Sequence, residues 1–82
     1  MKRRARLLNN GRISEGSVLD VQNDPATGAI TQIFYRYTIN GVEYESSQSL
    51  DAAQQQREID YAPGARITIR YDPHQPFNSV VV

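Results

Sequence analysis

The chain contains no cysteine and no long apolar run. Without cysteine it has neither disulfides nor thiolate zinc sites, so a hydrophobic core must hold the fold alone. No stretch approaches the ~20 apolar residues that a membrane-spanning helix needs. The 82 residues correspond to one domain. A chain of this length buries only about 60–65% of the surface that it exposes when unfolded, which leaves a small margin of stability.

The sequence also lacks net charge, because nine basic residues balance nine acidic ones. The two signs are nevertheless unevenly placed along the chain. The first twelve residues contain five basic residues and no acid, whereas residues 13–82 contain four basic and nine acidic residues. A basic arm on an acidic body indicates an anionic partner for the arm, or a role in solubility.

We predict a basic N-terminal arm over residues 1–10 and one β domain over residues 11–82. The arm places four positive charges beside two leucines, and its candidate contacts with an anionic surface are Lys2, Arg3, Arg4 and Arg6. Each such charge contributes about 1 kcal/mol near an anionic membrane. The alternative is a disordered soluble terminus. Because the arm lacks the apolar core of a signal peptide, we expect a cytoplasmic chain without a cleaved leader, with membrane-peripheral contact as an option.

The clearest strand follows Pro63-Gly64. Ile67, Ile69 and Tyr71 alternate there with polar residues, and Asp72-Pro73 ends the pattern. Side chains in a strand alternate with a period of two, so this pattern predicts a half-buried strand with its isoleucines inside.

A hairpin is predicted around Asn40-Gly41, between strands at 30–39 and 42–47. This dipeptide suits the two positive-φ positions of a type I′ turn, and a two-residue turn fixes the register. Ile39 then faces Val42, and Tyr37 faces Tyr44. All four lie on one face, and this agreement supports the register, because a shift by one residue would mix the two faces.

The remaining segments complete an all-β chain. Residues 11–21 are predicted as the first strand, with Gly16 at a bulge or bend, and residues 78–82 as the last. Residues 49–60 favour a short helix with Ser49 as N-cap, or a loop. Pro73 and Pro76 are expected to end strand pairing. We therefore predict a mainly antiparallel, five-stranded curled sheet or open barrel. Its predicted core comprises Val18, Ile33, Tyr35, Tyr37, Ile39, Val42, Tyr44, Ile67, Ile69 and Tyr71.

Four local patterns resemble the bacterial family catalogued as domain of unknown function 3592. They are residues 8–18 (Leu-Asn-Asn-Gly through Gly-Ser-Val), residues 35–44 around Asn-Gly, Tyr-Ala-Pro-Gly at 61–64, and Ile-Arg-Tyr-Asp-Pro-His-Gln-Pro at 69–76. The last is the most specific. The resemblance implies a small β domain of undetermined activity, often beside transmembrane helices, and it supplies no catalytic residues. This chain departs from that context because it has no such helix.

Two pairs of residues are candidates for a chemical site. Asp72 and His74 offer a carboxylate and the single histidine, but a metal needs three or four ligands, and turn formation explains the pair better. Glu43 and Glu45 share a strand face and could divide acid and base roles, but a solvated strand is the simpler interpretation. We therefore assign no catalytic residue, no cofactor and no metal.

Two groups of residues are candidate binding surfaces. Four tyrosines could line a ligand cleft, although core packing is favoured for them: Tyr35, Tyr37, Tyr44 and Tyr71. A second group, suited to stacking bases and contacting phosphates, comprises Phe34, Arg36, Arg66 and Arg70. The acidic body argues against nucleic acid as the partner.

From these observations we expect a non-catalytic interaction module whose partner is a protein or an anionic membrane surface. An open sheet leaves edges that a partner strand can extend, and residues 80–82 are the candidate edge. Such an edge also allows a monomer to self-associate weakly. The alternative is nucleic-acid binding through the basic arm and the arginine face, which comprises Phe34, Arg36, Arg66 and Arg70.

Overall fold

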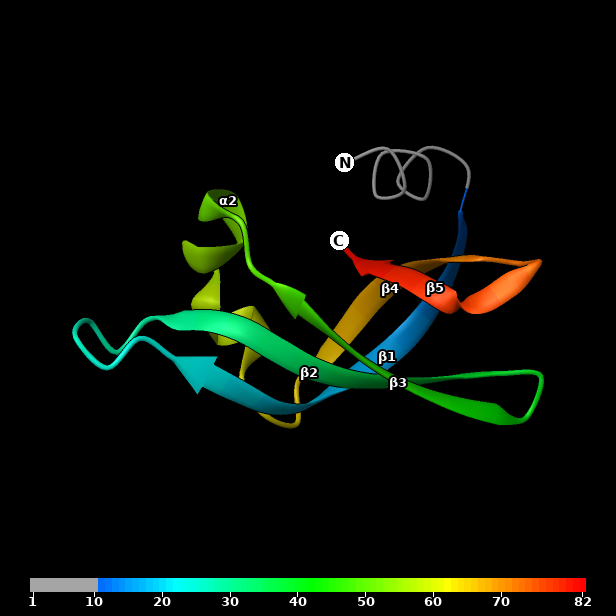
Figure 1. The fold of residues 1–82 in the computed structure, drawn as a ribbon, viewed down its shortest axis with the longest axis horizontal. Helices are drawn as coiled ribbons and strands as arrows, with labels where there is room; N and C mark the ends of the chain where they lie inside the picture. Colours follow the sequence, from blue (N-terminus) through cyan, green and yellow to red (C-terminus); the bar gives the residue numbers. More distant parts are fainter. Residues whose placement is uncertain (1–10) are drawn as a thin grey trace.

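The computed structural model describes residues 11–82 as one antiparallel sheet of five strands in the order β3-β2-β1-β4-β5. The sheet curls into an open barrel (Figure 1), which confirms the predicted fold class. The strands are β1 (Arg12–Asn23), β2 (Ile30–Ile39), β3 (Val42–Ser49), β4 (Arg66–Asp72) and β5 (Gln75–Val81). Between β3 and β4 the chain forms α2 (Ala52–Gln55) and the 3-10 helix η1 (Glu58–Tyr61).

The β2–β3 hairpin has the predicted register. Ile39 pairs with Val42 and Tyr37 with Tyr44. Asn40 and Gly41 both adopt positive φ angles, 52° and 80°, as a type I′ turn requires. Because the turn sets the pairing, Ile33, Tyr35, Tyr37 and Ile39 of β2 face the interior, whereas Phe34 lies on the outer face.

The central strand, β1, pairs with both β2 and β4. The bulge or bend predicted at Gly16 is displaced, because the register shifts of β1 against β2 lie between Val18 and Asp20 and between Gln22 and Asn23, while Gly16 pairs regularly with Tyr37 and Ile67. Glycine is required at position 16 for a different reason. A Cβ atom there would lie 2.7 Å from the main-chain carbonyl oxygen of Arg36.

The connection after β3 is helical, but the predicted N-cap was wrong. Ser49 is the last residue of β3, and Asp51 caps α2. The Asp51 carboxylate accepts a hydrogen bond from the Gln54 main-chain N–H at 2.8 Å, and the Gln54 side chain accepts one from the Asp51 N–H at 3.1 Å. Such a capping box satisfies two N–H groups that the helix leaves unpaired. Gln54 is the buried residue of α2.

The β4–β5 connection corrects the expectation for Pro76. Asp72 pairs with Gln75 across a turn at Pro73-His74, so β5 begins before Pro76. The register of the two strands then shifts, because Tyr71, the residue before Asp72, pairs with Ser79. Pro76 therefore lies within an irregular part of the strand, where the N–H that proline lacks is not needed for the ladder.

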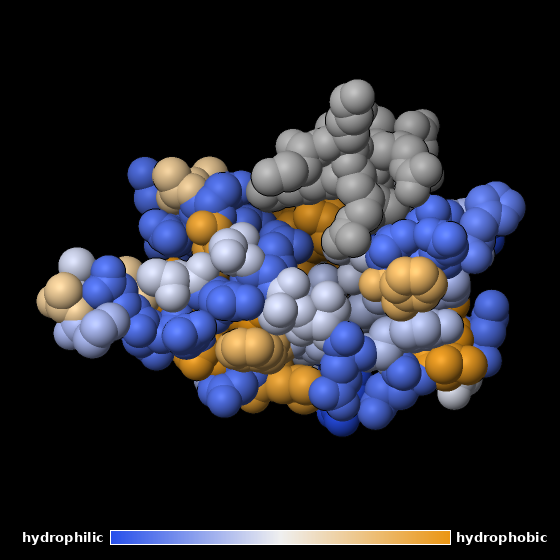
Figure 2. Space-filling view, in the orientation of Figure 1, coloured by the Kyte–Doolittle hydropathy of each residue, from blue (hydrophilic) through white to orange (hydrophobic). Residues whose placement is uncertain are grey.

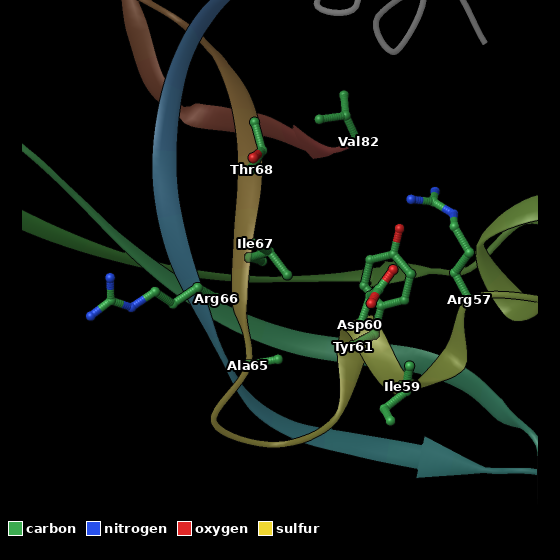
Figure 3. A pocket seen from close by; sticks show the side chains of 9 residues that line it. All are labelled: Arg57, Ile59, Asp60, Tyr61, Ala65, Arg66, Ile67, Thr68 and Val82. Carbon is green, nitrogen blue, oxygen red and sulfur yellow. The ribbon is translucent and has the colours of Figure 1, made fainter.

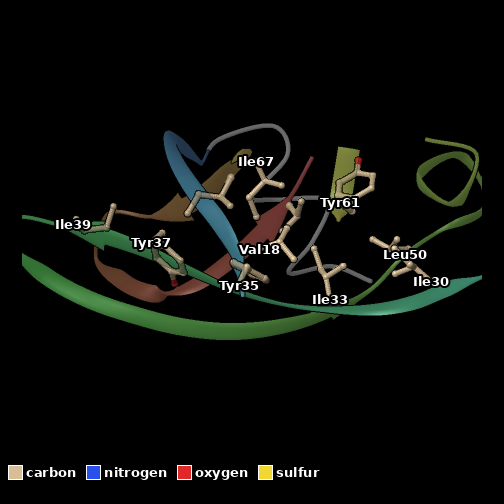
Figure 4. Close-up of a cluster of buried hydrophobic side chains, with 11 residues drawn as sticks. Val18, Ile30, Ile33, Tyr35, Tyr37, Ile39, Leu50, Tyr61 and Ile67 are labelled. Carbon is tan, nitrogen blue, oxygen red and sulfur yellow. The ribbon is translucent and has the colours of Figure 1, made fainter. Parts of the chain in front are cut away.

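The core lies on the inner face of the curled sheet, and η1 adds Tyr61 to it (Figure 4). Ile67 and Ile69 are buried and Arg66 is exposed, which confirms the predicted register of β4. Val42 was wrongly assigned to the core, because it lies beside the hairpin turn and is 52% exposed. Tyr44 and Tyr71 are partly buried against the core. The buried core members not predicted from the sequence are Ile30, Leu50, Tyr61 and Val81.

Candidate functional site

A glutamine side chain joins the two ends of the sheet. The carboxamide of Gln48 on β3 accepts a hydrogen bond from the Val81 N–H at 2.8 Å and donates one to the Val81 carbonyl at 3.2 Å. Gln54 donates a second hydrogen bond to the same carbonyl at 3.0 Å. The Gln48 carboxamide thus takes the place of a peptide group of a neighbouring strand. It nearly closes the barrel between β3 and β5.

This seam changes the expected location of the free edge. The sequence pointed to residues 80–82, but the outward main-chain groups of Val81 are bonded to Gln48 and Gln54. At the other end of the sheet order, β3 has β2 as its single ladder partner within residues 11–82. The edge that remains is therefore β3, before Gln48.

The hydrogen-bonding pattern between β2 and β3 shows which main-chain groups of β3 point away from β2. The Leu50 N–H donates to the Thr31 carbonyl at 3.0 Å. Opposite residues in an antiparallel pair alternate between bonded and non-bonded pairs, so the main-chain groups of Glu43, Glu45 and Ser47 point away from β2. Their side chains lie on the outer face and are exposed.

The predicted arginine face exists but is partly neutralised. Ser17 on β1 lies opposite both Arg36 and Arg66, so these two arginines share one row across three strands. The Arg36 guanidinium lies 3.6 Å from Glu43, and that of Arg66 lies 3.8 Å from Glu15. Both ion pairs are exposed, so each contributes at most about 1 kcal/mol to the stability of the fold.

The other two members of the predicted arginine face are Arg70, which is hydrogen-bonded, and Phe34, which is partly exposed. Arg70 lies on the same face of β4 and donates a hydrogen bond to the Gly11 carbonyl at 3.0 Å. Phe34 is 39% exposed on β2. In the view of Figure 2, hydrophilic residues cover most of the surface and apolar residues form separate small groups. The structure thus gathers the arginines without forming a continuous basic patch.

Of the four tyrosines, Tyr35 and Tyr37 are core residues with bonded hydroxyls. The Tyr35 hydroxyl lies 2.7 Å from Ser79 Oγ, and the Tyr37 hydroxyl donates to the Pro76 carbonyl at 2.6 Å. Their rings stack at 5.9 Å between centroids, and Tyr37 stacks on Tyr44 at 5.4 Å. This arrangement supports core packing over a ligand cleft.

The Asp72–His74 pair forms a turn. The Asp72 carboxylate accepts the His74 main-chain N–H at 2.8 Å, two residues along, as turn chemistry predicts. Within residues 11–82 the structure brings together no group of three potential metal ligands. The predicted contacts Lys2, Arg3, Arg4 and Arg6 lie outside the described residues.

Sequence reasoning missed four polar residues at structurally important positions: Gln48, Gln54, Arg57 and Tyr61. The signal for Gln48 was available, because it follows Tyr44 at even spacing and so occupies an inward position of β3. A polar residue at such a position needs a partner. The other three belong to the helical connection, whose path strand periodicity does not predict.

These features define a small β-barrel-like domain in which side-chain hydrogen bonds join β3 to the end of β5 at Val81 and the rest of β3 is an open edge. The chain belongs to the family described as "Domain of unknown function (DUF3592)", whose model matches residues 9–82. The resemblance noted from the sequence is therefore correct. Comparisons with curated proteins and with solved structures found no match. No helix among residues 11–82 is both long enough and apolar enough to cross a membrane.

Proposed function

We propose that this domain is a non-catalytic interaction module that binds an extended segment of a partner protein as an additional strand beside β3. The observation that supports this proposal is the edge itself. Over its eight residues β3 pairs with β2 without a register shift, and no other strand within residues 11–82 forms a ladder with it. A regular edge presents a row of main-chain donors and acceptors that an incoming strand can pair with.

The side chains of β3 indicate the chemistry of the partner. Glu43 and Glu45 are exposed beside the outward main-chain groups, and Val42 exposes half of its surface at the hairpin turn. Charged residues on an edge suppress unspecific pairing between sheets. A partner strand with lysine or arginine at alternate positions would instead be attracted to them. We therefore propose a basic, extended partner segment.

A proline substitution at the edge tests this proposal. The Glu45 N–H points away from β2, so Glu45→Pro removes an edge donor without removing a β2–β3 hydrogen bond. The matched control, Glu45→Thr, keeps the N–H and removes the same charge. The probe is an eight-residue peptide that alternates lysine and valine, followed by amide chemical shifts of the labelled protein.

The unmodified chain should show shifts at residues 42–47 and slowed exchange of the Glu43 and Glu45 amides. Glu45→Thr should weaken binding modestly, because it removes one charge, whereas Glu45→Pro should abolish binding. If the proline variant bound the peptide as well as the threonine variant, strand addition at β3 would be the wrong mechanism.

Nucleic-acid binding is the second candidate, and the shared row of Arg36 and Arg66 supports it. Phosphate contacts release counterions, so this binding would weaken steeply as salt rises. It would also be lost in Arg66→Glu, which leaves the β3 edge unchanged. Strand addition to β3 should tolerate Arg66→Glu and should weaken only modestly with salt, because salt screens the attraction to Glu43 and Glu45 but leaves the main-chain hydrogen bonds. Titration with a single-stranded oligonucleotide at two salt concentrations separates the two candidates.

The basic arm supports a membrane-peripheral role in the cytoplasm as a further part of this proposal. Lys2, Arg3, Arg4 and Arg6 supply the positive charge for an anionic lipid surface. Titration with anionic vesicles at low and physiological salt tests it. Salt-sensitive broadening of resonances from residues 1–12 is expected, and unchanged spectra would assign the arm to solubility alone.

A further inference from the structure

A second surface, distinct from the β3 edge, is a cleft of about 390 Å³ between η1 and β4. Its lining includes Arg57 and Tyr61 from the helical connection, Ile67 and Thr68 from β4, and Val82 after β5 (Figure 3). Its volume is within the range of small-molecule sites, which span roughly 300–1,000 Å³. The cleft therefore has room for a compact organic ligand.

The Tyr61 hydroxyl is unpartnered in this cleft. Tyr61 is 2% exposed, and among the described residues its oxygen is the buried side-chain polar atom that has no hydrogen-bond partner. Buried hydroxyls in proteins nearly always have partners, and those that lack one call for an explanation. In contrast, the hydroxyls of Tyr35 and Tyr37 are bonded. An acceptor supplied from outside the chain would satisfy Tyr61.

Arg57 supplies positive charge next to this hydroxyl. Its guanidinium carbon lies 5.7 Å from the centroid of the Tyr61 ring, and no carboxylate within residues 11–82 pairs with it. The guanidinium of Arg66 points away from the other lining residues and pairs with Glu15 (Figure 3). The cleft therefore offers one available guanidinium and one hydroxyl donor, which together suit a carboxylate.

The rest of the lining defines the remainder of the ligand. Asp60 adds a negative charge to the wall, so a monoanion is favoured over a dianion such as phosphate. Ile67 is buried at the base, and Ile59 on the rim exposes 84% of its surface. These two side chains offer apolar contacts to a short aliphatic group.

We propose that the cleft between η1 and β4 binds a carboxylate that is attached to a short aliphatic chain. The Tyr61 hydroxyl and the Arg57 guanidinium donate hydrogen bonds to the carboxylate, and Ile59 and Ile67 contact the aliphatic part. The carboxylate comes from a free acid or from the C-terminus of a peptide, since both present the same group.

Amide chemical-shift titration with hexanoate tests this proposal, with hexanamide as the uncharged probe. A ligand with about eight non-hydrogen atoms should bind with a dissociation constant on the order of 1 mM. Shifts should be confined to residues 57–61, 65–68 and 82. The proposal would be overturned if hexanoate caused no localised shifts, or if hexanamide bound as tightly as hexanoate. Acetyl-Ala-Val with a free or an amidated C-terminus then distinguishes the two sources of the carboxylate.

Three variants assign the roles of the residues. Tyr61→Phe removes only the unpartnered hydroxyl and keeps the ring, so the fold should be retained while hexanoate binding weakens about tenfold. Arg57→Gln should weaken it by a similar factor. Arg36→Gln is the matched control, because Arg36 lies on β2 and does not line the cleft, and it should leave binding unchanged. Equal affinity for the Tyr61→Phe variant and the unmodified protein would refute the assigned site.

Discussion

Replacing Gln48 with methionine should weaken the whole domain, although the residue lies on an edge strand. Methionine has nearly the same length and shape but neither donates nor accepts the bonds that Gln48 makes to Val81. Those bonds, at 2.8 and 3.2 Å, join β3 to β5. The substitution therefore removes the polar contacts across the seam and keeps most of the packing.

The expected loss follows from the groups left behind. The Val81 carbonyl keeps its hydrogen bond from Gln54, whereas the Val81 N–H loses its acceptor. The lost bond to the carbonyl, at ~1 kcal/mol, and the unpaired Val81 N–H, at about 1–3 kcal/mol, together give a loss of about 2–4 kcal/mol. Domains of this size have a free energy of unfolding of about 4–12 kcal/mol, so the change is readily measurable.

Urea denaturation of the variant and of the unmodified protein measures this loss, and hydrogen exchange locates it. The Val81 amide should exchange much faster in Gln48→Met, while amides in β1 change only with global stability. Gln22→Met is the matched control, because Gln22 is an exposed residue of β1. A loss below ~0.5 kcal/mol, with Val81 still protected, would refute the role assigned to the seam.

Three further substitutions probe the core. Ile69→Ala should cost about 2–5 kcal/mol in urea denaturation, because Ile69 is fully buried; a loss below ~1 kcal/mol would contradict its burial. Gly16→Ala should cost about 1–3 kcal/mol, since its Cβ would meet the Arg36 carbonyl at 2.7 Å, and an unchanged midpoint would show that the strands separate easily. Tyr35→Phe should cost about 1 kcal/mol or slightly more, because it leaves Ser79 Oγ without its partner; a gain in stability would argue against that hydrogen bond.

The β2–β3 hairpin and β4 could be predicted from the sequence because their signals are local. Asn40-Gly41 determines the turn, the turn determines the register, and the register places Ile33, Tyr35, Tyr37 and Ile39 inside. The error at Val42 has a tertiary cause. Alternation gives the face of a residue, but burial also needs a neighbouring element to cover that face, and Val42 lies at the end of the hairpin.

The functional surfaces were less predictable because they depend on contacts between distant segments. Gln48 bonds Val81 across 33 positions of sequence. Arg57 and Tyr61 meet β4 through a connection that has little periodicity. Helix propensity indicated α2, but the choice between Ser49 and Asp51 as N-cap depended on where β3 ends. That boundary is set by pairing with β2 rather than by β3 alone.

The seam explains why one domain has two different sheet edges. At Gln48 a side chain separates β3 from β5, so the two main chains lie too far apart to pair directly. Toward the hairpin turn β3 extends away from the β4–β5 turn, which leaves Glu43 and Glu45 on an open edge (Figure 1). Stability thus depends on one end of β3 and the proposed binding on the other. Gln48→Met should therefore destabilise the domain while the folded fraction still binds the basic peptide, whereas Glu45→Pro should abolish binding with the seam intact.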